Sequence, residues 1–253
     1  MIKIVNFARF CCPSEISKGI YNSLLKTCER NMYTIAVEGN IGSGKTTLLQ
    51  YFSNFPSTTV IQEPVERWRN INGYNLLDLM YQEPTRWSLT FQTYVQLTML
   101  QNHKKVSNTN IKLMERSIYS AKYCFVENLY QSGLMPKVEY LVLTEWFNWL
   151  ISNKDLKIDL IVYLRTKPEV AYKRIQERCR IEEKAISMDY LKSLHDLHEK
   201  WLTTKSDFVV PAPVLILDAN CELSDMQDTF RKYTCDILFQ NKHSPISGKA
   251  SSQ

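Results

Sequence analysis

A glycine-rich motif near the start of the chain limits its fold more than any other feature. Residues 39–46 read Gly-Asn-Ile-Gly-Ser-Gly-Lys-Thr, which fits the pattern G-x-x-x-x-G-K-T, and the apolar run 33–37 before them is typical of a buried strand. Glycines let the backbone turn tightly enough for successive N–H groups to point at one anion, and the helix that follows adds the positive end of its dipole. A turn without function would need neither the strand before it nor the amphipathic segment after it. The motif therefore predicts a phosphate-binding loop for a nucleoside triphosphate.

Two side chains of this loop have distinct expected roles. The Lys45 ammonium is placed to reach the β- and γ-phosphates, and the Thr46 hydroxyl is placed to bind Mg²⁺. The residues expected to bind the triphosphate here are Gly39, Asn40, Ile41, Gly42, Ser43, Gly44, Lys45, Thr46 and Thr47.

Strand-like and helix-like segments alternate along the rest of the chain. Apolar strands are expected at 33–38, 59–62, 111–115, 159–165 and 213–218. The longer helices are expected at 45–55, 84–104, 120–132, 138–152, 168–180, 188–201 and 223–239. Such alternation predicts an α/β fold in which a five-stranded parallel sheet carries helices on both faces. Ligands of these folds gather at the carboxyl ends of the strands.

Composition and charge argue against several classes of protein. The chain has 253 residues, 44% of them apolar, which suits one globular domain, and no stretch approaches the ~18 apolar residues of a membrane span. The seven cysteines show no C-x-x-C spacing, and no cluster of histidines accompanies them, so we expect neither a disulfide framework nor a zinc site. Free cysteines of this kind are typical of a protein in a reducing compartment. Residues 1–32 carry five basic and two acidic side chains, which accounts for three of the five net positive charges. We therefore expect neither nucleic acid nor a membrane as a partner.

The two ends of the chain differ from its body. Residues 1–32 are free of acidic side chains until Glu15, which is compatible with a mitochondrial transit peptide and also with an untargeted extension in a cytosolic or nuclear protein. Residues 241–253 are polar and typical of a disordered tail. The expected organisation is an N-terminal extension at 1–32, one folded domain at 33–240 and a tail at 241–253.

Charged residues follow two of the expected strands. Glu63 comes after the strand at 59–62, where a carboxylate can accept the proton of an attacking hydroxyl, although Glu before Pro is also common in turns. Glu115 and Arg116 end the strand at 111–115. The carboxylate could hold Mg²⁺ and the guanidinium a substrate oxygen or phosphate, although adjacent residues of this kind usually form a solvated ion pair. Both strands are expected to end at the edge that carries the phosphate loop.

Two helices carry further candidate residues. Four residues share one face of the helix at 84–104: Gln92, Val95, Gln96 and Met99. They form either a core stripe or one wall of a site for a planar heterocycle, whose donors and acceptors a buried glutamine amide can bind. Four basic residues follow in and after the helix at 168–180: Lys173, Arg174, Arg178 and Arg180. They form either a solvated face or a lid over phosphates.

Several segments together resemble the deoxyribonucleoside kinase family. They are 39–47, Gln-Glu-Pro-Val-Glu-Arg-Trp-Arg-Asn at 62–70, 76–81, 93–100, Glu-Arg-Ser-Ile-Tyr-Ser-Ala at 115–121, and 163–166. The likeness covers about residues 33–218 and neither end. Several independent motifs in order are far more specific than a phosphate loop alone.

The resemblance implies a role for each candidate residue. Glu63 would be the base on the substrate 5′-hydroxyl, with Arg116 and Lys45 as further catalytic residues, and Thr46 and Glu115 would hold Mg²⁺. Gln92 would bind the pyrimidine edge, Phe125 would stack on the base, and Tyr81 and Glu183 would bind the 3′-hydroxyl. The pocket walls would be Trp68, Leu77, Met80, Val95, Met99 and Ala121. The lid would be Arg174, Arg178 and Arg180.

The resemblance also implies an activity. A P-loop kinase fold with an arginine-rich lid would transfer the γ-phosphate of ATP, with Mg²⁺, to deoxyribonucleosides, mainly thymidine and deoxycytidine. A nucleoside monophosphate kinase shares the fold, but Glu63 would repel its second phosphate. A non-catalytic relative could dispense with Lys45, Thr46, Glu63 and Arg116, which are all present. A homodimer formed through the helices at 120–132 and 138–152 is implied as well.

Overall fold

A computed structural model describes residues 32–180, 183, 185–204, 206–222 and 225–238. By its internal contacts the chain divides into Met1–Asn31 and Met32–Gln253, and every described residue belongs to the second unit. The expected N-terminal extension, apart from Met32, and the expected C-terminal tail lie outside the described residues.

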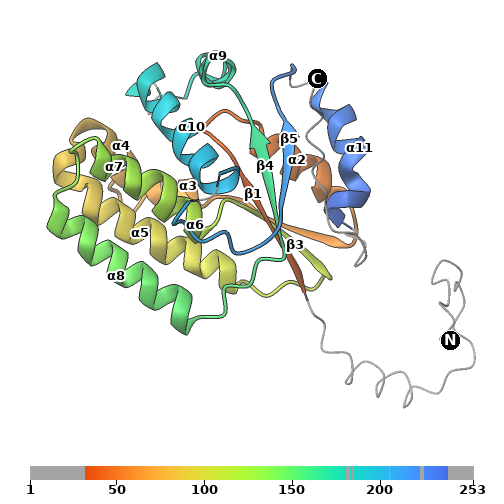
Figure 1. The fold of residues 1–253 in the computed structure, drawn as a ribbon, viewed down its shortest axis with the longest axis horizontal. Helices are drawn as coiled ribbons and strands as arrows, with labels where there is room; N and C mark the ends of the chain where they lie inside the picture. Colours follow the sequence, from red (N-terminus) through yellow and green to blue (C-terminus); the bar gives the residue numbers. More distant parts are fainter. Residues whose placement is uncertain (1–31, 181–182, 184, 205, 223–224, 239–253) are drawn as a thin grey trace, which may run out of the picture. The chain divides into compact units, whose positions relative to one another are not determined.

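Five parallel strands form the sheet at the centre of this unit (Figure 1). They are β1 (Tyr33–Glu38), β2 (Thr58–Ile61), β3 (Ile111–Glu115), β4 (Leu160–Arg165) and β5 (Val214–Asp218), in the order β2-β3-β1-β4-β5. Val37 of the central strand pairs with Glu115 of β3 and with Val162 of β4. The predicted α/β fold with a five-stranded parallel sheet is confirmed. Because β1 and β3 end side by side, the phosphate loop and Arg116 emerge at one edge.

Alternate residues of the strands face two separate cores. Ile35 and Val37 pack with α2 (Lys45–Ser53) and α11 (Met226–Leu238), whereas Ala36 faces the larger group of helices. Figure 1 shows α2 and α11 on one side of the sheet and α5, α8 and α10 on the other. The strands are therefore apolar along their length because both of their faces are covered.

The remaining α-helices lie between residues 65 and 202. They are α3 (Val65–Arg69), α4 (Leu76–Gln82), α5 (Pro84–Lys104), α6 (Ile118–Ser120), α7 (Glu127–Gln131), α8 (Lys137–Asn153), α9 (Pro168–Arg178) and α10 (Met188–Leu202). The prediction for 84–104 is confirmed at both ends, and the helices expected at 45–55, 168–180 and 188–201 begin at the predicted residue. The remaining ends of these helices, and both ends of those expected at 138–152 and 223–239, differ from the prediction by one to three residues. No helix among the described residues is long and apolar enough to cross a membrane.

The helix expected at 120–132 is not one regular helix. It consists of the end of α6, a π-helix η1 at Ala121–Val126, and α7. The Glu127 N–H donates to the carbonyl of Lys122, five residues earlier, as well as to that of Cys124. The π turn holds one more residue than an α turn, and apolar periodicity in the sequence does not reveal it.

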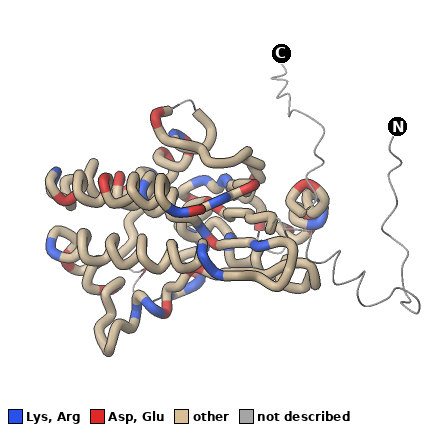
Figure 2. The backbone as a smooth tube through the Cα atoms, turned by 90° about the horizontal axis from the view of Figure 1, so that it is seen from below, with Lys and Arg blue, Asp and Glu red and all other residues tan. Residues whose placement is uncertain are grey.

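Basic and acidic residues are interspersed along the described chain (Figure 2). Many of them are exposed on helices, but a few acidic and basic side chains are buried where β1 and β3 end, among them Glu38, Lys45, Glu115 and Arg116. Burying charged groups is costly unless they face each other or a ligand. The buried charges therefore mark the candidate site.

Candidate active site

The phosphate loop adopts backbone angles that its glycines allow. Gly42 has a φ of 77° and Gly44 a φ of 91°, which other residues rarely adopt. A Cβ atom at Gly42 would also lie 2.6 Å from the carbonyl oxygen of Ala171 in α9. Glycine is therefore required there both by conformation and by the close approach of α9. The loop leads directly into α2, whose first residue is Lys45.

The Lys45 side chain lies over the loop and is buried. Its Nζ donates to the carbonyl oxygen of Asn40 at 2.7 Å and to that of Gly39 at 3.3 Å. Burial lowers the pKa of Lys45 to about 7, the Arg116 charge adds to this effect, and the carboxylates of Glu115 and Glu63 oppose it. A triphosphate bound in the loop would restore the charged form of the ammonium, because opposite charges nearby favour ionisation.

The residues expected to hold Mg²⁺ meet beside the loop. The Thr46 hydroxyl donates to Glu115 Oε1 at 3.1 Å, so that α2 and the end of β3 offer two oxygen groups at one point. Mg²⁺ prefers oxygen ligands and is usually bound through one or two protein groups together with phosphate oxygens and water. Across the described residues no cluster of three or more His, Cys, Asp or Glu could hold a metal by itself. The donor set thus fits Mg²⁺ that arrives with a triphosphate.

Glu63 and Arg116 form an ion pair at the same edge of the sheet. Arg116 Nε lies 3.2 Å from Glu63 Oε1, and Arg116 Nη1 donates to the Gly39 carbonyl at 2.8 Å. Arg116 has a φ of 60°, uncommon for a residue other than glycine, and its guanidinium lies 4.7 Å from the centre of the Phe125 ring. Burial raises the pKa of Glu63, although Arg116 opposes the shift. A carboxylate with a raised pKa is a stronger base than an exposed one.

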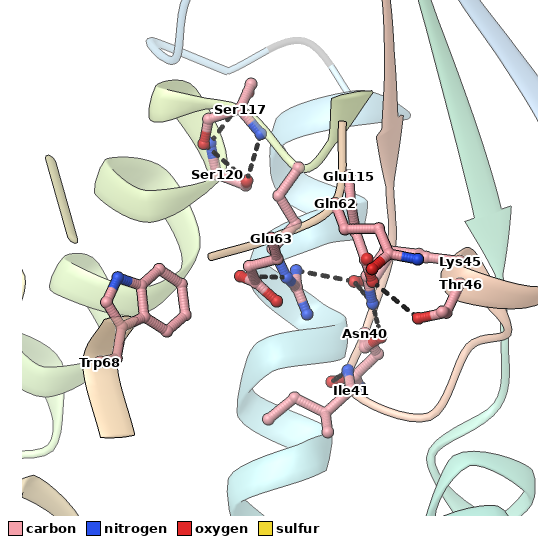
Figure 3. Close-up of polar contacts among 12 residues, drawn as sticks. Asn40, Ile41, Lys45, Thr46, Gln62, Glu63, Trp68, Glu115, Ser117 and Ser120 are labelled. Carbon is pink, nitrogen blue, oxygen red and sulfur yellow. Dashed lines mark hydrogen bonds and ion pairs between the residues drawn. The ribbon is translucent and has the colours of Figure 1, made fainter. Parts of the chain in front are cut away.

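A cavity of about 220 Å³ extends from this ion pair between α3, α4, α5 and η1. In the view of Figure 3, Glu63 stands between Trp68 on one side and the Lys45 end of α2 on the other. The Trp68 indole N–H donates to the Thr98 hydroxyl at 2.9 Å, which fixes the ring as a wall. Gln92 is buried, and its Oε1 has no hydrogen-bond partner in the described part of the chain. A buried amide of this kind needs a ligand or water to bind.

All residues expected to bind the nucleoside line this one cavity. They are Glu63, Trp68, Leu77, Met80, Tyr81, Gln92, Val95, Met99, Arg116, Ala121, Phe125 and Glu183. Lys45, Thr46 and Glu115 line its loop end. The cavity therefore opens toward the phosphate loop at the point where Glu63 and Arg116 meet.

The expected lid arginines fall into two groups. Arg178 donates to both carboxylate oxygens of Glu183, at 2.6 and 3.1 Å, and Arg180 contacts the same carboxylate at 3.4 Å. Both arginines line the cavity. Arg174 does not, because it belongs to the body of α9, where its guanidinium donates to the carbonyls of Gly42 and Cys221. Arg174 thus supports the phosphate loop from α9 rather than facing the cavity with the other two.

The sequence did not point to some of the lining residues. Tyr190, in the first turn of α10, and Phe91, beside Gln92, both line the cavity. Burial raises the pKa of Tyr190, so its phenol stays protonated as a hydrogen-bond donor. Phe91 could have been found from its spacing, because it lies four residues before Val95 and eight before Met99 on the same face of α5. Tyr190 belongs to an amphipathic helix whose pattern carries no sign of a ligand.

The parallel sheet and the loop after β1 place the molecule among the P-loop proteins, which bind nucleoside triphosphates. The chain belongs to the deoxynucleoside kinase family, whose model matches residues 35–237. It is therefore a deoxynucleoside kinase, a phosphotransferase.

Individual relatives agree with this assignment. The chain is 53% identical to human mitochondrial thymidine kinase 2 over 213 residues, which cover 83% of the chain and 80% of the relative. It is 52% identical to the same enzyme of Macaca fascicularis over 224 residues, which cover 88% and 84%. It is 35% identical to human deoxycytidine kinase over 234 residues, which cover 81% and 90%.

Proposed function

We propose that the enzyme transfers the γ-phosphoryl group of ATP to the 5′-hydroxyl of pyrimidine deoxyribonucleosides, mainly thymidine and deoxycytidine. The observation that carries this proposal is the cavity that joins the phosphate loop to Gln92, with the Glu63–Arg116 pair between them. The names of the relatives, thymidine kinase and deoxycytidine kinase, support the choice of substrates.

In the proposed mechanism, Glu63 takes up the proton of the 5′-hydroxyl. The 5′-oxygen then bonds to the γ-phosphorus, the bond from that phosphorus to the β,γ-bridging oxygen breaks, and ADP leaves with the electron pair. Arg116 holds the Glu63 carboxylate in place, and Lys45 balances the charge on the transferred group. Mg²⁺, held by Thr46 and Glu115, would neutralise the phosphate oxygens. Such transfer is accelerated mainly by positioning and electrostatics.

Base recognition would depend on one amide and several apolar walls. Gln92 would bind the edge of the pyrimidine and Phe125 its face, while Val95 and Met99 would crowd a purine. Tyr81 and Glu183 would bind the 3′-hydroxyl. A ribose would place in the cavity a 2′-hydroxyl for which the proposal assigns no partner among the described lining residues, and a buried hydroxyl without a partner costs about 1–3 kcal/mol. Ribonucleosides should therefore react about ten- to a hundredfold less efficiently.

A homodimer and a mitochondrial location are part of the proposal. Most of residues 120–131 is buried within the subunit, so that segment offers little surface to a partner. Of the large apolar side chains that are exposed in the described part of the chain, five belong to α8: Val138, Leu141, Val142, Trp146 and Trp149. A face of this kind supports an interface centred on α8. The names of the two thymidine kinases support a mitochondrial location, with residues 1–32 as the targeting extension.

The test is ATP consumption with Mg²⁺ and a panel of acceptors. Thymidine and deoxycytidine should be phosphorylated, and their monophosphates should not, because Glu63 would repel a phosphate at the 5′ position. The Lys45→Ala variant, purified in parallel, controls for contaminating kinases. Activity with monophosphates alone would make the protein a nucleoside monophosphate kinase, and no activity with any acceptor would make it a non-catalytic relative.

A further inference from the structure

The π-helix η1 forms one wall of the nucleoside cavity. Ala121 and Phe125, both in η1, line the cavity, and the Phe125 ring also packs on the Arg116 guanidinium. A backbone bond of π type, from the Glu127 N–H to the Lys122 carbonyl five residues earlier, closes the end of this turn. Such turns are rare and occur often at functional sites. What holds this turn therefore affects where the wall stands.

A buried polar cluster lies on the other side of η1, toward α8. Lys122 Nζ lies 3.7 Å from Glu127 Oε2 and 4.1 Å from the centre of the Tyr140 ring. The Tyr140 hydroxyl donates to Glu127 Oε2 at 2.9 Å, and Gln131 Nε2 donates to Glu127 Oε1 at 2.8 Å. Lys122 is only 3% exposed and Glu127 8%. None of these residues lines the cavity.

The Lys122–Glu127 ion pair matches π geometry and not α geometry. In an α-helix, residues five apart point about 140° away from each other, because each residue turns the helix by about 100°. In a π turn, residues five apart stand nearly one above the other, since the backbone bond itself joins them. The same two residues thus share a backbone bond and a side-chain ion pair. A return to α geometry would separate the two charges inside the protein.

The charges of the cluster are consistent with this arrangement. Burial lowers the pKa of Lys122, and the neighbouring Glu127 carboxylate opposes that shift. Burial and Glu127 raise the pKa of Tyr140 to about 12, so its hydroxyl stays protonated and donates. A buried lysine without a carboxylate partner would be strongly disfavoured. The pair is therefore most stable when the π turn is closed.

We propose that Lys122, Glu127 and Tyr140 are positioning residues that hold η1 in its π turn and thereby set the place of Ala121 and Phe125 against the nucleoside base. This inference rests on the proposed function only in that the cavity binds a nucleoside. Through Tyr140, α8 would then support the cavity wall that η1 forms, although no residue of α8 lines the cavity.

The first test compares two tyrosine variants that each remove one hydroxyl bonded to a glutamate. Tyr140→Phe removes the bond to Glu127, and the control Tyr163→Phe removes the bond from Tyr163 to Glu199 at 2.7 Å, away from the cavity. Tyr140→Phe should raise the KM for thymidine about tenfold, less than the ~10²-fold that an ångström of misplacement can cost. The KM for ATP and kcat should stay near wild type. Tyr163→Phe should lower Tm without changing the KM for thymidine.

The second test replaces the ion pair by neutral groups of similar shape in the double variant Lys122→Met/Glu127→Gln. It should raise the KM for thymidine more than Tyr140→Phe does and should improve the use of nucleosides with larger bases relative to thymidine. Equal effects of Tyr140→Phe and Tyr163→Phe on the KM for thymidine, or an unchanged KM in both the Tyr140 and the double variant, would overturn the proposal.

Amide hydrogen exchange gives a readout that needs no activity. The Glu127 amide should exchange at least tenfold faster in Tyr140→Phe than in Tyr163→Phe, because the first variant loosens the π turn and the second does not. Equal rates would overturn the proposal. If the wild type phosphorylates no nucleoside, the proposed function fails, and the exchange rates still decide whether the cluster holds the turn.

Discussion

Glu38, the last residue of β1, is completely buried beneath the phosphate loop, and its burial should make the stability of the protein depend on pH. Neither of its carboxylate oxygens makes a hydrogen bond of good geometry to any described residue, although the hydroxyls of Ser117 and Ser120 lie close enough to affect it. Burial raises the pKa of Glu38 from 4.5 to about 7, and Ser117, Arg116, Ser120 and Lys45 oppose the shift only in part.

This shift makes stability depend on pH. Since the folded state binds the Glu38 proton more tightly than the unfolded state does, its contribution is fully present below pH 4.5 and is lost as the pH rises through 7. A shift from 4.5 to about 7, at about 1.4 kcal/mol per unit, amounts to about 3 kcal/mol. Glu38→Gln is neutral at every pH and should escape this loss.

The assay is urea unfolding of both proteins at pH 5 and at pH 8. The free energy of unfolding of Glu38→Gln, minus that of wild type, should rise by about 2.5 kcal/mol between the two values, because part of the loss has already occurred at pH 5. Other groups titrate in both proteins and largely cancel in the difference. Asp236→Asn, at an exposed site on α11, is the control and should show the same difference from wild type at both pH values. A difference for Glu38→Gln that does not change with pH would refute the reasoning.

Three further predictions concern the reaction. Lys45→Ala should fold and nearly abolish phosphoryl transfer in a coupled ADP assay; wild-type turnover would show that the loop does not bind the transferred group. Val95→Ala combined with Met99→Arg should shift the ratio of kcat/KM values away from thymidine, and a wild type that already prefers deoxyguanosine would contradict the account of the walls. Replacing thymidine by 3′-deoxythymidine should cost more kcat/KM in wild type than in Glu183→Gln, and equal costs would show that Glu183 does not bind the 3′-hydroxyl.

The sequence predicts those parts of the site that follow from local pattern. The phosphate loop at Gly39 to Thr46 is predicted by its glycines and by the Lys-Thr pair that follows a strand and begins a helix. Glu63 and Glu115 follow from the rule that ligands gather where parallel strands end. These residues do meet in the structure. The apolar strands were also within one residue of their observed ends.

Other parts depend on contacts between segments far apart in the sequence. Arg174 looks like its neighbours Arg178 and Arg180, yet its place in α9 turns it toward the Gly42 carbonyl. The π turn at 121–126 leaves the apolar pattern nearly unchanged, so a helix was the natural prediction. Tyr190 reaches the cavity only because α10 packs beside the loop, where the Asn40 amide donates to the Leu191 carbonyl at 2.8 Å.

The central claim is that Glu63 is the base for the 5′-hydroxyl, and Glu63→Gln tests it most directly. The measurement is the single-turnover rate of thymidine phosphorylation, made together with the thymidine Kd by calorimetry. The account predicts a rate lower by about 10²- to 10⁴-fold, the usual effect of losing a positioned base, with a Kd within a few-fold of wild type. A variant that keeps the wild-type rate but binds thymidine much more weakly would contradict it, because Glu63 would then bind the nucleoside without taking its proton.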